Sequence, residues 1–187
     1  MKRFLTVCLG LVLILSGCTF KDDAVDYGLR LRSTILSSSG CSFEAVVTAD
    51  YGDRLYSFCV NCITDQSGKL TFHITEPETI IGISGFISQG RSALTFDDKV
   101  LAFPQLTDDN ILPVSAPWIL MNSLKSGYLT ACGKTENGYK LLLNDSYEEE
   151  ALQLEVYIDC DLKPYYCEIM WNGRRVLSMK ITNFKFL

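Results

Sequence analysis

From Ser42 to the C-terminus, apolar residues recur at every second position, and this period constrains the fold more than any other feature of the sequence. The alternation is clearest in residues 152–160, which place Leu152, Leu154, Val156, Ile158 and Cys160 on one side and Gln153, Glu155, Tyr157 and Asp159 on the other. Successive side chains of a β-strand point to opposite faces, so the pattern predicts strands with one dry face and one wet face.

About eleven such segments follow one another, and turn signals such as YGD, QSG, SQG and ENG separate them. Short connections of this kind favour an antiparallel meander. A long sheet that is wet on one face must curl until its dry face covers itself. We therefore predict a mainly β (α+β) fold, in which a single curved antiparallel sheet of about eleven strands forms an incomplete β-barrel.

Two segments with helical spacing accompany the strands. Residues 24–38 predict an N-terminal helix that places Val25, Leu29, Ile35 and Leu36 near one face and ends before Gly40. The second helix interrupts the strands at residues 118–125, with Ser115 as its cap, Pro117 in its first turn and Gly127 after its end. Because apolar residues surround most of this second helix, we expect it to be inserted at the mouth of the barrel.

The N-terminus predicts export. Lys2 and Arg3 precede a mainly apolar run, Phe4 to Leu15, that is shorter than the roughly 20 residues of a membrane-spanning helix. A charged start, a short apolar run and small residues are typical of a signal peptide. The stretch LSGC, which ends at Cys18, resembles the lipobox of bacterial lipoproteins, in which the cysteine is acylated and the chain is cut before it.

This resemblance implies a lipid anchor on Cys18, with acyl chains such as palmitate, and a location on the extracytoplasmic face of the cell membrane. Two alternatives remain open, namely a plain signal peptide and a buried N-terminal helix with an incidental cysteine. We expect residues 1–17 to be the signal peptide, 18–23 the lipidated Cys18 and a short tether, and 24–187 one domain. No internal repeat or long linker divides that domain.

The charge of the chain argues against nucleic acid as a partner. The first 17 residues hold two of the 17 basic residues and none of the 22 acidic ones, so the remainder carries a net charge of −7 with His73 neutral. An acidic surface repels phosphate backbones. We therefore expect no nucleic acid partner.

Six cysteines follow Cys18, and two pairs of them are candidate disulfides. If residues 50–53 form the first hairpin loop, Cys41 faces Cys62, and pairing Ile158 with Ile169 brings Cys160 to Cys167. The alternative is that these cysteines are buried with free thiols. The CVNC stretch, Cys59 to Cys62, does not predict a zinc site, because residues three apart on a strand point to opposite faces.

No enzyme signature stands out in the sequence. His73 is the only histidine, and within KLTFHIT it reads as a half-exposed strand residue. The acidic doublets, Asp97-Asp98 and Asp108-Asp109, and the run at residues 148–150 read as solvated turns. We expect no catalytic residue, no metal and no cofactor.

The whole chain after the tether resembles a bacterial lipoprotein family related to the lipoprotein-sorting factors LolA and LolB. The stretches that carry the resemblance are SFEAVVTADYGDRLYSF, FHITEPETIIGISG, LTFDDKVLAF, PVSAPWILMNSLKSGY and NGRRVLSMKITNFKF. The resemblance implies an incomplete antiparallel barrel with helices at its mouth and an apolar cavity for acyl chains. The anchor at Cys18 makes the chain similar to LolB, whereas LolA has no anchor.

The resemblance implies a non-catalytic carrier or chaperone whose partner is a hydrophobic ligand, such as a lipid or an acylated protein. The candidate cavity-lining residues come from the dry strand faces and the inserted helix: Phe43, Phe58, Trp118, Met121, Val156 and Ile158. The same residues would also form an ordinary filled core. The alternative function is a scaffold that uses its exposed strand edges to bind and regulate another envelope or cell-wall protein.

Overall fold

The computed structural model describes residues 23–97, 99–102, 106–107 and 110–187. The predicted signal peptide and Cys18 lie outside the described residues. The described helices are α2 (Asp23–Ser37), the 3₁₀ turn η1 (Pro113–Ser115) and α3 (Ala116–Ser126). Both α-helices lie where the sequence predicts them, and no described helix has the length and apolar character needed to span a bilayer.

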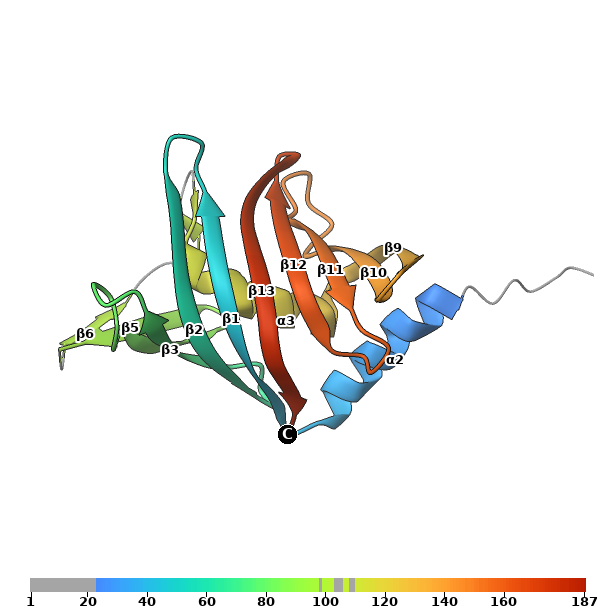
Figure 1. Ribbon diagram of the computed structural model, residues 1–187, viewed down its shortest axis with the longest axis horizontal. Coiled ribbons are helices and arrows are strands. Elements are labelled where there is room, and N and C mark those ends of the chain that lie inside the picture. The colour runs from blue at the N-terminus through green and yellow to red at the C-terminus, as the bar shows by residue number, and fades with distance from the viewer. Residues whose placement is uncertain (1–22, 98, 103–105, 108–109) are drawn as a thin grey trace, which may run out of the picture.

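Eleven of the described strands form one antiparallel sheet, as predicted, in the order β6-β5-β4-β3-β2-β1-β13-β12-β11-β10-β9 (Figure 1). Its strands are β1 (Gly40–Asp50), β2 (Leu55–Asp65), β3 (Leu70–Glu76), β4 (Ser84–Ser88), β5 (Arg91–Phe96), β6 (Lys99–Ala102), β9 (Tyr128–Thr135), β10 (Gly138–Asn144), β11 (Gln153–Ile158), β12 (Pro164–Trp171) and β13 (Arg174–Phe186). A separate two-stranded ladder joins β7 (Leu106–Thr107) to β8 (Asn110–Ile111).

The first and last strands of the chain are neighbours at the centre of the sheet (Figure 1). β1 pairs with β13 in antiparallel register, with Ala45 opposite Ile181 and Val47 opposite Met179. All four of these side chains are buried on the dry face. The free edges of the sheet are consequently β6 and β9, and α3 lies in the chain segment between them.

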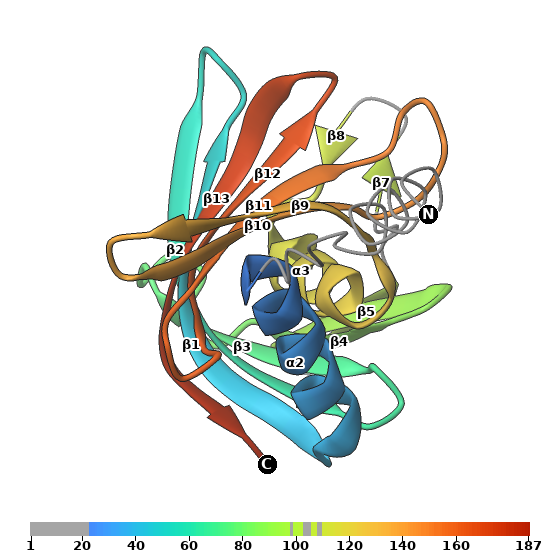
Figure 2. The same cartoon turned by 90° about the vertical axis from the view of Figure 1, so that its right-hand side faces the viewer.

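Both α-helices pack inside the curve of the sheet, which confirms the incomplete barrel (Figure 2). On α3, Ile119, Leu120 and Leu124 are buried among the dry-face side chains. Burial on so many sides of a short helix explains why apolar residues surround it. Ser115 is the residue before the helix, as predicted, but its side chain makes no capping hydrogen bond.

The inward face of α2 differs from the predicted one. Gly28 and Leu31 face the sheet, whereas Val25, Leu29 and Leu36 are exposed. A Cβ at Gly28 would lie 3.0 Å from Leu129 Cδ2 on β9 and 3.2 Å from Leu141 Cδ2 on β10. The helix therefore approaches β9 and β10 closely at Gly28. Of the predicted face, Ile35 is buried as predicted.

The predicted register of the first hairpin is wrong by two residues. Cys41 lies opposite Thr64, and Cys62 lies opposite Phe43. The turn explains the shift, because Asp50 pairs with Leu55 as the last rung and its Oδ1 accepts a hydrogen bond from the Gly52 N–H at 2.9 Å. Gly52 has a φ of 89°, which a glycine adopts without strain. The loop is therefore residues 51–54.

The hairpin between β11 and β12 also differs from the prediction. Asp159 Oδ1 accepts hydrogen bonds from the main-chain N–H groups of Asp161 and Lys163, at 2.9 and 2.8 Å, and so forms a tight turn. Cys160 is exposed in this turn, while Cys167 is buried opposite Val156. Neither candidate disulfide is formed, and none of the six cysteines in the described part of the chain is in a disulfide.

Candidate functional site

A pocket of about 270 Å³ opens between α3, the end of α2 and two hairpin turns of the sheet. The turns are the one between β2 and β3 and the one between β4 and β5. Its lining residues are Leu36, Thr64, Ser67, Gly68, Gln89, Trp118, Met121, Asn122, Lys125 and Ser126. Apolar and polar side chains are therefore mixed around one opening.

α3 provides one wall of the pocket. Trp118, Met121 and Lys125 are three and seven residues apart, which places them on one side of the helix. Trp118 Nε1 donates a hydrogen bond to Gly68 O at 3.2 Å, and Lys125 Nζ donates to Gln66 O at 3.1 Å. Two side chains of α3 thus hold the turn between β2 and β3 against the helix.

The shape of that turn is set by Asp65. Its Oδ1 accepts hydrogen bonds from Ser67 Oγ at 2.6 Å and from Lys69 N at 3.1 Å. The hydrogen bond from Ser67 is the main reason that the pKa of Asp65 lies below its ordinary value. Gly68 follows with a φ of 84°, a backbone conformation that favours glycine. Contacts within the turn thus hold its shape in addition to the contacts from α3.

α2 closes the pocket at the end of α3. Leu36, which is 56% exposed, lies at the opening, and Arg32 reaches the last turn of α3. Arg32 Nε donates to Leu124 O at 2.9 Å, and Arg32 Nη2 donates to Gly127 O at 2.5 Å. A guanidinium at a helix C-terminus satisfies carbonyl groups that have no partner within the helix.

A smaller hollow of about 40 Å³ adjoins the pocket and shares Leu36, Thr64 and Lys125 with it. Cys41 lines this hollow, and Thr64 Oγ1 accepts a hydrogen bond from the Cys41 main-chain N–H at 2.9 Å. Burial raises the pKa of the Cys41 thiol above its ordinary value. A thiol of raised pKa is mostly protonated at neutral pH and is therefore a poor nucleophile.

The predicted cavity residues divide into two groups. Trp118 and Met121 line the pocket, and Met121, which is 3% exposed, also belongs to the core. Phe43, Val156 and Ile158 are packed in the core with at most 3% of their surface exposed and do not line this pocket. Phe58 is also a core residue and borders a different, more open hollow of about 420 Å³ that includes Val46, Cys59 and Glu76.

Sequence reasoning did not find Lys125 or Leu36. Lys125 lies seven residues after Trp118 on the predicted helix, and this spacing could have indicated that the two side chains share one side of it. No periodicity could show that the exposed Leu36 meets the turn between β2 and β3, because that contact joins segments far apart in the chain.

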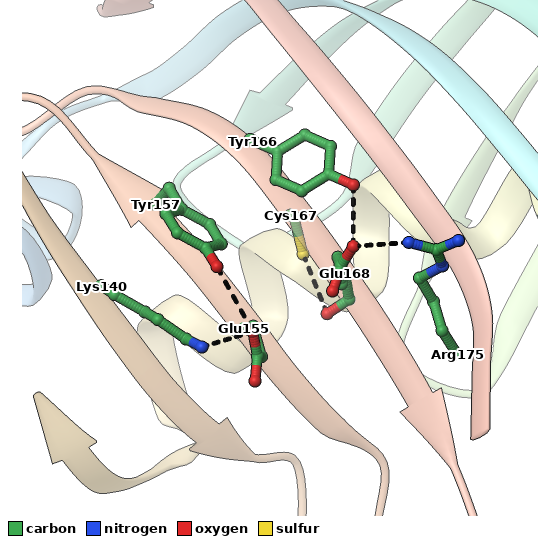
Figure 3. Close-up of polar contacts among 7 residues, drawn as sticks. All are labelled: Lys140, Glu155, Tyr157, Tyr166, Cys167, Glu168 and Arg175. Atoms are coloured by element: carbon green, nitrogen blue, oxygen red, sulfur yellow. Dashed lines mark hydrogen bonds and ion pairs between the residues drawn. The ribbon is translucent and has the colours of Figure 1, made fainter. Parts of the chain in front are cut away.

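The outer face of the sheet carries a polar network on β10 to β13 (Figure 3). Glu155 and Glu168 lie directly opposite each other on β11 and β12. Like charges at such positions are unfavourable, and each is neutralised separately. Lys140 Nζ lies 2.6 Å from Glu155 Oε2, and Arg175 Nη1 lies 2.8 Å from Glu168 Oε1.

The ionisation of this network follows from its contacts. Burial alone would raise the pKa of Glu168, but hydrogen bonds from Arg175 and Tyr166 outweigh it and leave the pKa below its ordinary value. The hydrogen bond to Glu155 is the main reason that the pKa of Lys140 is raised. Both carboxylates are therefore paired with cations. The network stabilises the outer face of the sheet by linking neighbouring strands.

The CVNC stretch lies on β2, where Cys59 is partly exposed and Cys62 is buried, so the two face opposite ways as predicted. Cys59 Sγ donates to Glu76 Oε2 at 3.2 Å, and burial, with this contact, raises the pKa of the Cys59 thiol. His73 is exposed on β3. Within the described ranges, no cluster of three or more histidine, cysteine or acidic residues could hold a metal ion.

No protein-family model matches this sequence, and no curated protein matches it. A DUF1329 family protein from Desulfovibrio piger aligns with a TM-score of 0.51 at 8% identity, over 88% of this chain and 92% of that chain. A LolA superfamily protein from Nitrosomonas europaea aligns with a TM-score of 0.47 at 9% identity, over 88% and 93%. The lipoprotein LppX from Mycobacterium tuberculosis aligns with a TM-score of 0.44 at 8% identity, over 88% and 96%.

At these identities the similarity concerns the fold alone, and the Desulfovibrio protein gives the highest TM-score of the three. The sheet is antiparallel and does not close, and its two helices lie on the dry face (Figure 2). This is the architecture that the resemblance to LolA and LolB implies. The chain therefore has a LolA-like fold.

Proposed function

We propose that this protein is a lipid-anchored envelope protein that binds the apolar part of an amphiphile in the Trp118 pocket, without covalent chemistry. Residues 1–17 serve as the signal peptide, Cys18 carries the anchor, residues 18–23 form the tether and residues 24–187 are the binding domain. The ligand is a lipid or the acyl chain of another lipoprotein, and the protein works at the extracytoplasmic face of the cell membrane.

The composition of the pocket is the observation that carries this proposal. Leu36, Trp118 and Met121 supply apolar surface, while hydrogen-bonding side chains such as Asn122 and Gln89 border the same space. A concave site with apolar walls and a few polar groups is the usual form of a small-molecule site. Its volume of about 270 Å³ suits one acyl chain or part of one better than a large ligand.

Native mass spectrometry of residues 19–187 tests the proposal. The protein is exported without its anchor, purified without detergent and analysed before and after incubation with membranes, and the same sample is then extracted for lipids. A bound mass that extracts as a lipid, acyl glycerol or lipopeptide is the expected result. A bare polypeptide mass in both samples would contradict the proposal.

Anchoring is tested separately on the full-length chain produced in a bacterial host. Metabolic labelling with palmitate should label the wild type and not Cys18→Ser. Labelling that persists in Cys18→Ser would show that Cys18 is not the acylated residue. The binding experiment does not depend on this result, because it uses a chain without the anchor.

The second candidate function, a scaffold for an envelope protein, is favoured by the edge strand β6. Val100 is 68% exposed and Leu101 is 59% exposed on this strand, which has a neighbour on one side only. Exposed apolar strand edges accept an added strand from a partner. The opposite edge, β9, packs against α2 and carries Thr130 and Lys134 instead.

A crosslinking experiment in the native envelope separates the two functions. If the scaffold function holds, a stoichiometric protein is captured by the wild type and lost with Leu101→Lys, while no lipid is bound. Capture that is unchanged by Leu101→Lys would exclude β6 as the docking strand. The Lys134→Glu variant at the other sheet edge is the control.

A further inference from the structure

We infer that the Trp118 pocket selects a single-chain amphiphile with an anionic headgroup, and that Lys125 is the residue that makes this selection. The inference rests on the proposed function, since it names the ligand class of the same pocket.

The pocket has an unusual charge for this protein. The chain has 22 acidic and 17 basic residues, yet the described residues that line the pocket include one cation, Lys125, and no carboxylate. The remaining polar residues of the lining are neutral: Thr64, Ser67, Gln89, Asn122 and Ser126. The hydroxyls of Ser67 and Ser126 already donate to Asp65 Oδ1 and Asn122 O, so the side-chain amides of Gln89 and Asn122 are the neutral donors that can face a ligand. With the Lys125 ammonium, these donors complement a negative headgroup, whereas the ammonium repels a positive one.

Lys125 also lines the adjoining smaller hollow, where Asp65 is the acidic residue. Asp65 lines the smaller hollow and not the larger pocket. Its Oδ1 accepts hydrogen bonds from Ser67 Oγ and Lys69 N, and its pKa is lowered chiefly by the bond from Ser67. The carboxylate is thus engaged within the turn.

Lys125 is held in place by its contact with the turn. Its hydrogen bond to Gln66 O at 3.1 Å orients the ammonium, which has three donors, and uses one of them. Its position in the last turn of α3 also suits a cation, because a helix C-terminus carries partial negative charge. The ammonium is therefore positioned before a ligand arrives, which lowers the entropic cost of binding.

The dimensions of the pocket argue for one chain. Trp118 and Met121 form the apolar wall on α3, Leu36 faces them from α2, and the volume is about 270 Å³. Typical ligand pockets are about 300–1,000 Å³, so two acyl chains would need more room than this space provides. A fatty acid and an anionic lysophospholipid share the required chemistry.

Isothermal titration calorimetry of residues 19–187 tests the inference with three probes below their critical micelle concentrations. The probes are dodecanoate, 1-dodecanol and lauroyl lysophosphatidylglycerol. We expect the wild type to bind dodecanoate about tenfold more tightly than dodecanol, because a charge-assisted hydrogen bond is added. Tighter binding of the lysophospholipid than of dodecanoate would also support the inference and would identify a membrane lipid as the source.

Lys125→Gln is the decisive variant, because it removes the charge and keeps a hydrogen-bond donor. It should lower the affinity for dodecanoate about tenfold and leave that for dodecanol unchanged, whereas Lys125→Arg should restore the preference. Lys69→Gln is the matched control, since Lys69 lies beside the same turn, over the Phe86 ring, and does not line the pocket. Added salt should weaken binding of the two anionic probes and leave dodecanol binding unchanged.

The outcomes separate the inference from the proposed function. If dodecanoate and dodecanol bind the wild type equally, or if Lys125→Gln weakens both alike, the pocket binds amphiphiles but the inferred selection is wrong. If no probe binds the wild type, the proposed function fails and the inference fails with it. An equal effect of Lys69→Gln would also overturn the role of Lys125.

Discussion

The guanidinium of Arg32 on α2 donates from Nε to the main-chain oxygen of Leu124 in the last turn of α3, at 2.9 Å. Its Nη2 also donates to Gly127 O at 2.5 Å, so one side chain ties the end of α3 to α2. Lys125, which lies between these two acceptors in sequence, is held on the other side by Gln66 O. The geometry of the pocket thus depends on how Arg32 fixes the end of α3.

Replacing Arg32 with methionine should destabilise the domain by about 2 kcal/mol, because partly buried carbonyl groups at the helix end lose a charged donor. Urea denaturation followed by circular dichroism measures the change. Arg30→Met on the same helix is the control and should cost less than about 1 kcal/mol, since Arg30 is exposed and its described contact is with the Tyr27 ring. Equal losses for both variants would show that the contact between Arg32 and α3 adds no stability.

Trp118→Ala should weaken lipid retention more than it weakens folding, because Trp118 lines the pocket and is only partly buried. Ile119→Ala is the matched control on the same helix, as Ile119 is 6% exposed and faces the core. The Ile119 variant should lose about 2–5 kcal/mol of stability and retain its ligand when folded. Retention is read by native mass spectrometry and stability by thermal unfolding. Unchanged retention in Trp118→Ala would count against the pocket.

Stability should fall in acid partly because of Glu168. Its folded pKa lies below its ordinary value of 4.5, so the unfolded chain binds the proton more readily, and the stabilisation is present above that value and lost as the pH falls through the folded pKa. Glu168→Gln should therefore cost about 1 kcal/mol at neutral pH and progressively less in acid. Urea midpoints measured from neutral to acidic pH test this.

The partner of Glu168 provides the check on this assignment. Arg175→Gln should produce the same reduction in acid sensitivity, because the hydrogen bond from Arg175 is the largest of the contacts that lower the pKa of Glu168. If Arg175→Gln leaves the pH dependence as it is in the wild type, the ion pair is not its source.

The cysteines should differ in reactivity in the native protein. Cys160 is exposed and should react with iodoacetamide, whereas Cys62 and Cys167 should be protected, since burial raises the pKa of each thiol and blocks access. Intact mass after labelling, with and without denaturant and in the absence of reductant, measures this. Denatured protein should take up label at Cys41, Cys62, Cys160 and Cys167. Protection of these four in denaturant would instead support the two disulfides predicted from the sequence.

The sequence by itself determined which face of the central strands is dry. Val156 and Ile158 are fully buried, and Glu155 faces outward beside them, as the period of two predicts. It also determined where α2 and α3 lie and that the sheet must curl. These properties follow from local backbone geometry and from the burial of apolar surface. Both depend on the order of apolar and polar residues within short segments of the chain.

Only the tertiary structure decided the register and the pocket. Hydrogen bonds from turn N–H groups to Asp50 and Asp159 shift the hairpins and so separate the cysteines that the apolar pattern had paired. The pairing of β1 with β13 and the contact of Lys125 with Gln66 join residues far apart in the chain. Shifting a strand by two residues keeps its apolar side chains on the dry face, so the period of two fits several registers equally well. Side-chain contacts in the folded protein determine which of these registers forms.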